Sequence, residues 1–437
     1  MKKSKYNFLT DRQNQSVLYN LYTDELCILE PRLKELYIEN DGEGIQRIHP
    51  TFYDYLIEKG FLIDPDIDEA KRQITEWEKS DTSEDIFQIT VNPTLNCNMR
   101  CWYCYEEHLA KTNMSEGVLA SIVKLIENKV KNPQLKHINL SFFGGEPLLS
   151  FSNIVLPLLK AADELCHANG KLLSTSFVTN GYLLTEQVLN DLKSISVDRP
   201  VVFQITLDGN EGYHDMTRHT AQGEGSYRRI VKHVKAAIQQ GFPITLRLNY
   251  TAKNILSFVD ILSDLQDITA EERSTLLYID MHRVWQDKTS NSERLESEEK
   301  TLRETFKKEG FRISEKKSID KYRCYADAEN HVVVNYNGDL YRCTARDFKP
   351  EIREGFLTED GILQWNEHSQ KRNSIRFGNE FCRTCRIYPL CHGLCSQSKL
   401  ESNDETGCYC HYDDEKKREL VEDRVNVLLE TNSLINQ

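Results

Sequence analysis

Long apolar segments are missing from this chain of 437 residues. No run approaches the ~20 apolar residues that a membrane helix requires, and Met1 leads into no apolar signal-peptide segment. An excess of basic residues is also missing, because 55 Lys and Arg stand against 68 Asp and Glu, a formal net charge of −13. Because phosphate recognition needs a basic surface, this balance argues against a general nucleic-acid binder. We therefore expect a cytoplasmic protein that binds neither membrane nor nucleic acid.

Cysteine, in contrast, is abundant, and its 13 residues are clustered. Three lie between positions 97 and 104, and eight lie between positions 324 and 410. In a cytoplasmic protein, clustered cysteines indicate metal or redox chemistry more often than disulfides. Only Cys27 and Cys166 stand apart, and we expect both to be small buried residues.

The residue pattern divides the chain into four segments. Residues 1–84 predict a small α+β domain with a hairpin over 17–29, and residues 287–323 predict a solvated helical connection. Residues 324–437 hold the cysteine-rich module and a final helix. Between them, residues 85–286 alternate strands and helices, with strands expected at 86–91, 138–143, 171–179, 201–207, 244–250 and 276–284. Six such strands predict an α/β fold with a parallel sheet, closed as a partial (β/α)6 TIM-like barrel.

The strongest motif directly follows the first strand of this barrel. Cys97, Cys101 and Cys104 have the spacing Cys-x3-Cys-x2-Cys, and three thiolates on one loop can converge on one metal centre. A cubane iron–sulfur cluster usually has four cysteine ligands, so three leave one iron open to a small molecule. The alternative is a zinc knuckle with His108 as its fourth ligand, which the spacing disfavours.

This run is similar to the cluster motif of the radical S-adenosylmethionine (SAM) superfamily. The resemblance implies that the three cysteines hold a [4Fe–4S] cluster, whose open iron binds the amino and carboxylate groups of the methionine moiety of SAM. It also places Tyr103 near the adenine. The implied activity is the formation of a 5′-deoxyadenosyl radical, with an external electron donor.

Further motifs follow the later strands. After the second strand, the two glycines at 144 and 145 allow close approach to the backbone, and the next carboxylate can accept hydrogen bonds from an ammonium group. The resemblance implies a SAM pocket made by Tyr103, Gly144, Gly145, Glu146, Ser176, Asn180, Asp208 and Arg218. In that pocket Glu146 faces the methionine amino group, and Arg218 can pair with the cofactor carboxylate.

The second cysteine group consists of Cys324, Cys343, Cys382, Cys385, Cys391, Cys395, Cys408 and Cys410. Eight thiolates suffice for two clusters, although Cys-x2-Cys pairs also suit zinc. An Asn-Gly turn within 332–343 predicts a hairpin that brings Cys324 and Cys343 together.

The layout resembles the auxiliary-cluster (SPASM) domain behind radical SAM barrels that modify peptides. It implies one cluster on Cys382, Cys385, Cys391 and a terminal cysteine, with Cys410 favoured over Cys408. The other cluster would use Cys324, Cys343 and Cys395. Because no further cysteine closely follows Cys324, that cluster either keeps an open iron or takes Cys408.

The resemblance implies an oxidoreductase-type peptide maturase. It would install a crosslink, thioether or C–C bond in a ribosomally made precursor peptide, whose leader residues 1–84 would bind as an added strand. A packing role for residues 1–84 is the alternative. The alternative functions are a sulfatase-maturing formylglycine enzyme and, in another class, an iron–sulfur electron carrier or metal-dependent regulator. Asp208 and Asp327 are candidate catalytic groups by position only.

Overall fold

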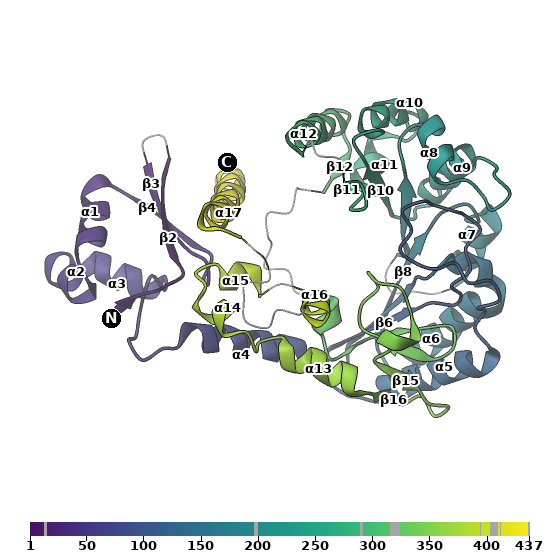
Figure 1. The fold of residues 1–437 in the computed structure, drawn as a ribbon, viewed down its shortest axis with the longest axis horizontal. Coiled ribbons are helices and arrows are strands. Elements are labelled where there is room, and N and C mark those ends of the chain that lie inside the picture. The colour runs from purple at the N-terminus through teal and green to yellow at the C-terminus, as the bar shows by residue number, and fades with distance from the viewer. Residues whose placement is uncertain are drawn as a thin grey trace. The chain divides into compact units, whose positions relative to one another are not determined.

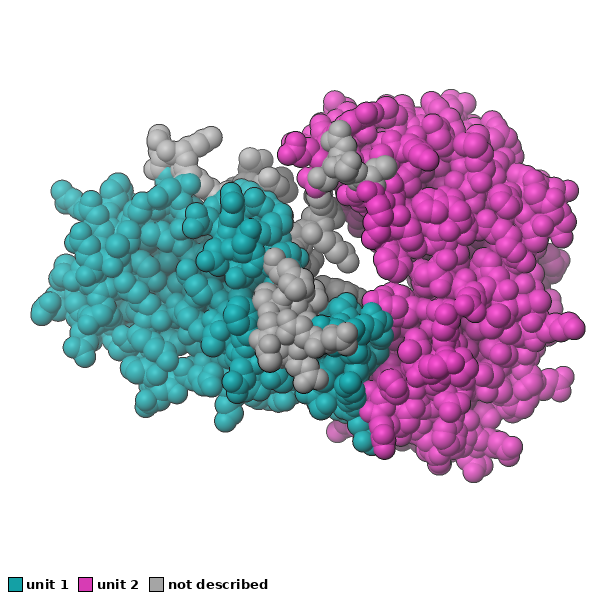
Figure 2. All heavy atoms as spheres, viewed as in Figure 1, with its two compact units in different colours: residues 1–82, 316–329, 370–437 teal, residues 83–315, 330–369 magenta. Residues whose placement is uncertain are grey.

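The computed structural model describes residues 1–12, 15–195, 200–288, 292–314, 324–393, 395–402, 410 and 412–435 (Figure 1). The chain forms two compact units (Figure 2). The terminal unit comprises Met1–Thr82, Lys316–Glu329 and Gln370–Gln437, and the barrel unit comprises Ser83–Glu315 and Asn330–Ser369. No helix in the described ranges is long and apolar enough to cross a membrane.

A sheet of eleven strands is the centre of the barrel unit. Its strands are β6 (Ile86–Val91), β7 (His137–Phe142), β8 (Leu172–Thr179), β9 (Val202–Leu207), β10 (Ile244–Tyr250), β11 (Leu277–Arg283), β12 (Arg312–Ile313), β13 (His331–Val334), β14 (Asp339–Tyr341), β15 (Gly355–Leu357) and β16 (Leu363–Trp365). The six predicted strands are β6 to β11, they are parallel neighbours, and the predicted α/β fold is confirmed. The sheet continues beyond both ends of this set, with β12 beside β11 and β13 beside β6, both parallel.

Helices cover the apolar side of this sheet. They are α5 (Glu116–Val130), α6 (Leu156–Ala168), α7 (Glu186–Lys193), α8 (Glu211–Thr217), α9 (Tyr227–Gln239), α10 (Ile261–Asp264), α11 (Ala270–Thr275) and α12 (Ser292–Lys308). Strand β6 shows why the layers form, because Phe87, Ile89 and Val91 are buried in the common core while the residues between them face the other side. Ser115 begins α5 as predicted, since its side chain accepts a hydrogen bond from the N–H of Val118.

Two parts of this unit differ from the sequence-based division at 84, 286 and 323. Helix α12 lies in the predicted solvated connection, yet Leu295, Leu302 and Phe306 are buried in the barrel core. Its charged run concealed this apolar stripe. Residues 330–369 also belong to the barrel unit, because β13 pairs with β6 in register from His331 opposite Gln88.

The terminal unit contains residues from both ends of the chain. Its elements are β1 (Lys2–Lys3), β2 (Asn7–Arg12), β3 (Gln15–Asn20), β4 (Glu25–Leu29), α1 (Pro31–Glu39), α2 (Gly42–Ile48), α3 (Pro50–Glu58), β5 (Leu62–Ile63), α4 (Glu69–Asp81), α14 (Glu380–Thr384), α15 (Tyr388–Cys391), α16 (Ser396–Glu401) and α17 (Asp414–Ile435), with α13 (Glu367–Ile375) crossing the division between the units. Strands β3 and β4 form the predicted hairpin, and β2 adds a third antiparallel strand that the sequence pattern did not reveal. Tyr6, Trp77, Tyr388 and Val421 share one buried cluster, so residues from the two ends of the chain pack together.

Candidate functional site

The cysteine loop after β6 is held in place by backbone contacts on both sides. Cys97 is buried, Cys101 is partly buried and Cys104 is exposed. The N–H of Cys104 donates to the C=O of Cys101 at 3.2 Å, so the loop turns back at this point. The N–H of Arg100 donates to the C=O of His219 at 3.1 Å, which ties the loop to the segment after α8.

Burial controls the chemistry of the three thiols. Desolvation raises the pKa of Cys97 to about 12 and that of Cys104 to about 11, with the charge of Cys101 acting on both in the same direction. No three His, Cys, Asp or Glu side chains within the described residues already form a metal-binding group. His108 lies beside Cys104, with its Nε2 3.4 Å from the cysteine sulfur. This contact is the one that the zinc alternative requires.

Glu146 is fully buried, and its carboxylate is already bound by the protein. Oε1 accepts hydrogen bonds from the N–H of Leu148 at 2.9 Å and from Oγ1 of Thr179 at 2.8 Å. Oε2 accepts one from the N–H of Asn180 at 2.8 Å. The carboxylate thus joins the loop after β7 to the loop after β8. Its predicted contact with an ammonium group stays a prediction.

The two glycines before Glu146 explain how the cysteine loop is supported. Gly144 has φ +98°, and a Cβ there would lie 2.6 Å from the C=O oxygen of Thr94. A Cβ on Gly145 would lie 2.3 Å from the C=O oxygen of Asn96, which is also the acceptor of the Glu146 N–H at 2.9 Å. The close approach that these glycines permit is therefore made by the backbone just before Cys97.

The hydroxyl group of Tyr103 joins three strand ends of the barrel. It donates to Oδ2 of Asp208 at 2.9 Å, and it accepts from Nη1 of Arg218 at 2.9 Å and from Nδ2 of Asn249 at 3.0 Å. Asp208 and Arg218 are buried, and Nη1 of the arginine lies 3.6 Å from Oδ2 of the aspartate. Burial raises the pKa of Asp208 to about 6, although the nearby Arg218 cation opposes this.

His214 contacts the backbone of Asp208 directly and that of Arg218 through Ser226. Its Nδ1 accepts from the N–H of Asp208 at 3.3 Å, so Nε2 carries the proton and donates to Oγ of Ser226 at 3.0 Å. The Ser226 hydroxyl in turn donates to the C=O of Arg218 at 2.5 Å. Desolvation lowers the pKa of His214 well below its usual range, so the ring is neutral.

The predicted residues of the third strand divide between two surroundings. Asn180 is buried and donates from Nδ2 to Oδ1 of Asn98 at 2.7 Å, beside the cysteine loop. Ser176 lies on β8, and its hydroxyl is 2.7 Å from that of Ser141 on β7. The structure thus brings Asn180 to the loop of the three cysteines and leaves Ser176 within the sheet.

Three polar residues of this region were not found from the sequence. They are Asn98, Asn249 and Gln286, and the last donates from Nε2 to the C=O of Tyr103 at 2.6 Å. Each of three regions of the site, at Asn98, Arg218 and Gln286, has one buried atom with no hydrogen-bond partner among the described residues: Nδ2 of Asn98, Nε of Arg218 and Oε1 of Gln286. Because buried polar atoms are normally paired, these three indicate where a polar ligand would bind.

Comparison with known proteins identifies the domain that carries this site. Residues 91–262, which include the three cysteines, match the family model described as "Radical SAM superfamily". This chain contains a radical SAM domain. Its cofactors are a [4Fe–4S] cluster and SAM.

Individual proteins are similar to different shares of this chain. The radical SAM cyclopropyl synthase TigE of Paramaledivibacter caminithermalis is 30% identical over 218 residues, 45% of this chain and 42% of that protein. The chain spans about half the length of the curated relatives it matches first.

Two solved structures share the fold over more of the chain. One is anSMEcpe with bound AdoMet and Cp18Cys peptide, with TM-score 0.59, 16% identity, and coverage of 80% of this chain and 99% of that one. The other is Streptococcus suis SuiB bound to precursor peptide SuiA, with TM-score 0.54, 14% identity, and coverage of 94% and 100%. At these identities the likeness concerns the fold.

The C-terminal cysteines of this chain fall into two groups. Of the C-terminal cysteines within the described residues, six lie in the terminal unit and Cys343 lies in the barrel unit. Three of the six affect the pKa of a fourth, Cys391. A hydrogen bond with Cys410 is the main cause that lowers the pKa of Cys391, and the charges of Cys382 and Cys385 act against it. Cys408 lies outside the described residues, so the preference for Cys410 as terminal ligand stays a prediction.

The remaining predicted residues are divided between the two units. The Asn-Gly hairpin is confirmed, because β13 and β14 pair and Gly338 has φ +86°. Cys343 follows it in the barrel unit, whereas Cys324 and the exposed Cys395 belong to the terminal unit, so their shared cluster stays a prediction. Asp327 also belongs to the terminal unit, where its carboxylate lies 3.7 Å from Nε of Arg376.

Proposed function

We propose that this radical SAM enzyme modifies a side chain of a ribosomally made precursor peptide, forming a crosslink, thioether or C–C bond. The observation that carries the proposal is the fold likeness to SuiB, which extends over 94% of this chain and therefore beyond the barrel. In that structure SuiB is bound to the precursor peptide SuiA. The cysteines gathered in the terminal unit support the same proposal, because an auxiliary cluster can receive the electron released when a peptide radical is oxidised.

In this proposal the three cysteines of the loop after β6 hold the [4Fe–4S] cluster. When bound, the reduced cluster and SAM supply a 5′-deoxyadenosyl radical that abstracts a hydrogen atom from the substrate. The residues present fit these groups, because the loop offers three thiols and the unpartnered Nε of Arg218 can donate to a carboxylate. The Tyr103 hydroxyl holds this guanidinium in place through Nη1.

The protein also shapes the space in which the substrate reacts. On β10, Leu246 and Leu248 are buried in the core, so Arg247 and Asn249 face the opposite, inner side of the sheet. Asp280 is the register partner of Arg247 on β11. Charged groups on the inner face of the barrel can orient a polar peptide backbone and exclude competing hydrogen donors.

The auxiliary clusters and the partners complete the proposal. Cys382, Cys385, Cys391 and Cys410 would hold one cluster, and Cys324, Cys343 and Cys395 would contribute to the second. An external donor supplies the first electron. Residues 1–84 would bind the precursor leader, a role that the three-stranded sheet in this region can support by adding a strand.

A sulfatase-maturing activity is the second candidate. It is favoured by the TM-score of 0.59 to anSMEcpe, whose structure contains the bound Cp18Cys peptide. The coverage of this chain, 80% against 94% for SuiB, favours the precursor maturase instead. A plain electron carrier has no need of a radical SAM domain.

The test begins with chain reconstituted and reduced in the absence of air. We expect it to convert SAM to 5′-deoxyadenosine, measured by liquid chromatography and mass spectrometry. Cys101→Ala should reduce this product to background and remove about a third of the iron if three clusters are present. Cys27→Ala, which changes a cysteine outside both cysteine groups, is the matched control. It should keep the wild-type yield of 5′-deoxyadenosine and the wild-type iron content.

The substrate is tested with short peptides encoded beside this gene and with a sulfatase-derived cysteine peptide. Loss of two hydrogens from a neighbouring peptide supports the proposal. Formylglycine in the sulfatase peptide, with the neighbouring peptides unchanged, supports the second candidate. Absence of 5′-deoxyadenosine from protein with a full iron content would refute both.

A further inference from the structure

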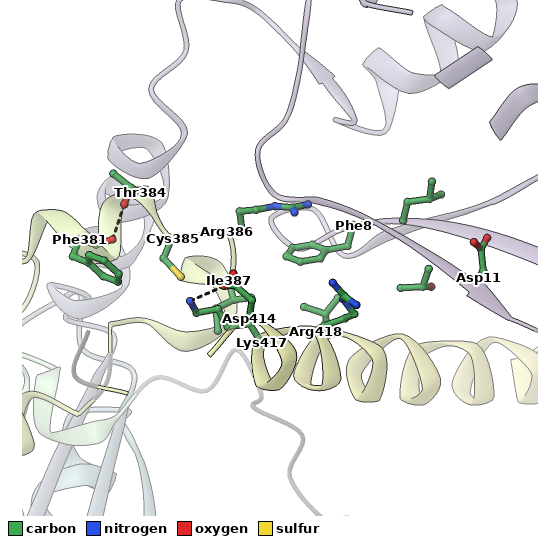
Figure 3. Close-up of a pocket in the computed structure, with 13 residues that line it drawn as sticks. Phe8, Asp11, Phe381, Thr384, Cys385, Arg386, Ile387, Asp414, Lys417 and Arg418 are labelled. Carbon is green, nitrogen blue, oxygen red and sulfur yellow. Dashed lines mark hydrogen bonds and ion pairs between the residues drawn. The ribbon is translucent and has the colours of Figure 1, made fainter. Parts of the chain in front are cut away.

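A cavity of about 670 Å³ lies in the terminal unit along strand β2 (Figure 3). Four consecutive residues of this strand, Phe8–Asp11, line one wall. Residues between 381 and 387 and the first turns of α17 supply the other walls. Successive side chains of a strand point to opposite faces, so a cavity that touches four in a row lies along the hydrogen-bonding edge of the strand.

The register of the sheet shows that this edge is open. The strand order is β2-β3-β4, so β2 has a neighbour on one side only. The N–H of Leu21 donates to the C=O of Tyr6 at 3.0 Å, and hydrogen-bonded pairs alternate along an antiparallel ladder. The N–H and C=O groups of Leu9 and Asp11 therefore point away from β3, toward the cavity. An edge of this kind is a template for one more strand.

Two arginines give the cavity its charge. Arg386 donates from Nη2 to the C=O of Asn7 at 2.5 Å, and its guanidinium lies 4.4 Å from the centre of the Phe8 ring. Arg418 is exposed on α17. Among the described residues neither arginine has a carboxylate partner. Figure 3 shows both beside Phe8, at the same stretch of the cavity.

The acidic residues of the cavity do not cancel this charge. Asp11 is paired with Lys34, whose Nζ lies 2.7 Å from its carboxylate. Asp414 is paired with Lys417 at 3.3 Å. The two unpaired guanidinium groups therefore give an otherwise acidic chain a local site that suits carboxylates.

We propose that this cavity binds an extended peptide segment with acidic side chains, which adds to β2 as a fourth strand. The backbone of the segment pairs with Leu9 and Asp11, and its carboxylates meet Arg386 and Arg418. The inference rests on the proposed function in that it takes a peptide as the partner. Beyond the proposed function, the inference specifies that the peptide pairs with β2, that it binds at the open edge of the sheet, and that its side chains are acidic.

The probe is a fluorescein-labelled nonapeptide of alternating Glu and Val, with a Lys–Val peptide of equal length for comparison. Binding to the full chain is measured by fluorescence anisotropy. We expect the Glu–Val peptide to bind at least about tenfold more tightly than the Lys–Val peptide, and Arg418→Met to weaken it by about tenfold. Lys416→Met is the matched control, because Lys416 lies on the same helix outside the cavity and pairs with Glu419.

N-methylation of the peptide tests strand addition itself. Methyl groups on alternate residues in one phase face β2 and should abolish binding, whereas methyl groups in the other phase should leave it intact. Equal effects of both phases, or binding that Arg418→Met leaves unchanged, would overturn the inference. The inference would also be overturned if the chain still formed 5′-deoxyadenosine but did not bind the Glu–Val peptide. That result would not contradict the proposed radical chemistry. Peptide binding without 5′-deoxyadenosine would refute the proposed function alone.

Discussion

Replacing Glu146 by glutamine separates a structural role of this carboxylate from a ligand-binding role. Glutamine keeps one oxygen, which can still accept from Leu148 and Thr179, but it presents an NH2 group to the N–H of Asn180. One hydrogen bond to a charged acceptor is lost and a buried donor is left unpaired. Such a loss costs about 2–4 kcal/mol. The loops after β7 and β8 should therefore open more readily in the variant.

Hydrogen exchange of the cofactor-free chain measures this effect. A cost of about 2–4 kcal/mol corresponds to roughly 30- to 1000-fold less protection. The reporting amides are those of Asn180 and Gly145, the latter of which donates to the C=O of Thr94 at 3.1 Å. Glu127→Gln is the control, because Glu127 is a half-exposed partner of Lys131 and contributes little.

The two roles predict different results. If Glu146 joins the loops, protection and iron content fall before SAM is added. If it serves only to bind the methionine ammonium, both stay at the wild-type level and only the affinity for SAM decreases. Unchanged protection at Asn180 in Glu146→Gln would refute the structural reasoning given above.

Three further predictions concern other parts of the chain. Gly145→Ala should lower iron incorporation at the loop cluster, because its Cβ would lie 2.3 Å from a backbone oxygen, whereas Gly117→Ala, with its nearest atom at 3.7 Å, should not. Burial raises the pKa of Asp208 to about 6, so the folded state binds this proton more tightly than the unfolded state does. The resulting stabilisation, about 3 kcal/mol, is fully present below about pH 4 and is lost as the pH rises through 6. Asp208→Asn should remove that slope from urea unfolding followed between pH 4 and 7. Lys399→Met should lower the midpoint potential of the proposed cluster near Cys382 by tens of millivolts in an EPR titration, because a cation next to a cluster favours its reduced state.

The prediction for Lys399 follows from an unusual burial. The lysine is only 5% exposed, and its ammonium donates to the C=O of Arg376 at 2.7 Å. A Cβ on Gly393 would lie 3.2 Å from this ammonium and 3.5 Å from the sulfur of Cys382, so the cation and the sulfur face the same glycine. An unchanged potential in Lys399→Met would show that the positive charge does not reach the cluster.

Local patterns were sufficient for the barrel and for the cysteine loop. Strand β6 was predictable because Phe87, Ile89 and Val91 alternate with polar residues, and such alternation follows from the geometry of one strand. The three cysteines after it lie within eight residues of sequence, so their common loop requires no knowledge of the rest of the fold. Helix α12 was misread for the opposite reason, because charged neighbours surround its buried Leu302 and Phe306.

The partners within the site were not predictable, because they are set by pairings between distant segments. Tyr103 meets Asp208 and Asn249, more than 100 residues away, only after five parallel strands have brought their carboxyl ends together. Asn249 nevertheless left a signal, since it alternates with the buried Leu248 and must therefore face the inside of the barrel once β10 is known. The same argument applies to Asp280 on β11. Inward-facing polar residues near the carboxyl ends of predicted barrel strands are therefore candidate site residues, as the loop motifs are, because the parallel sheet places both at the same end of the barrel.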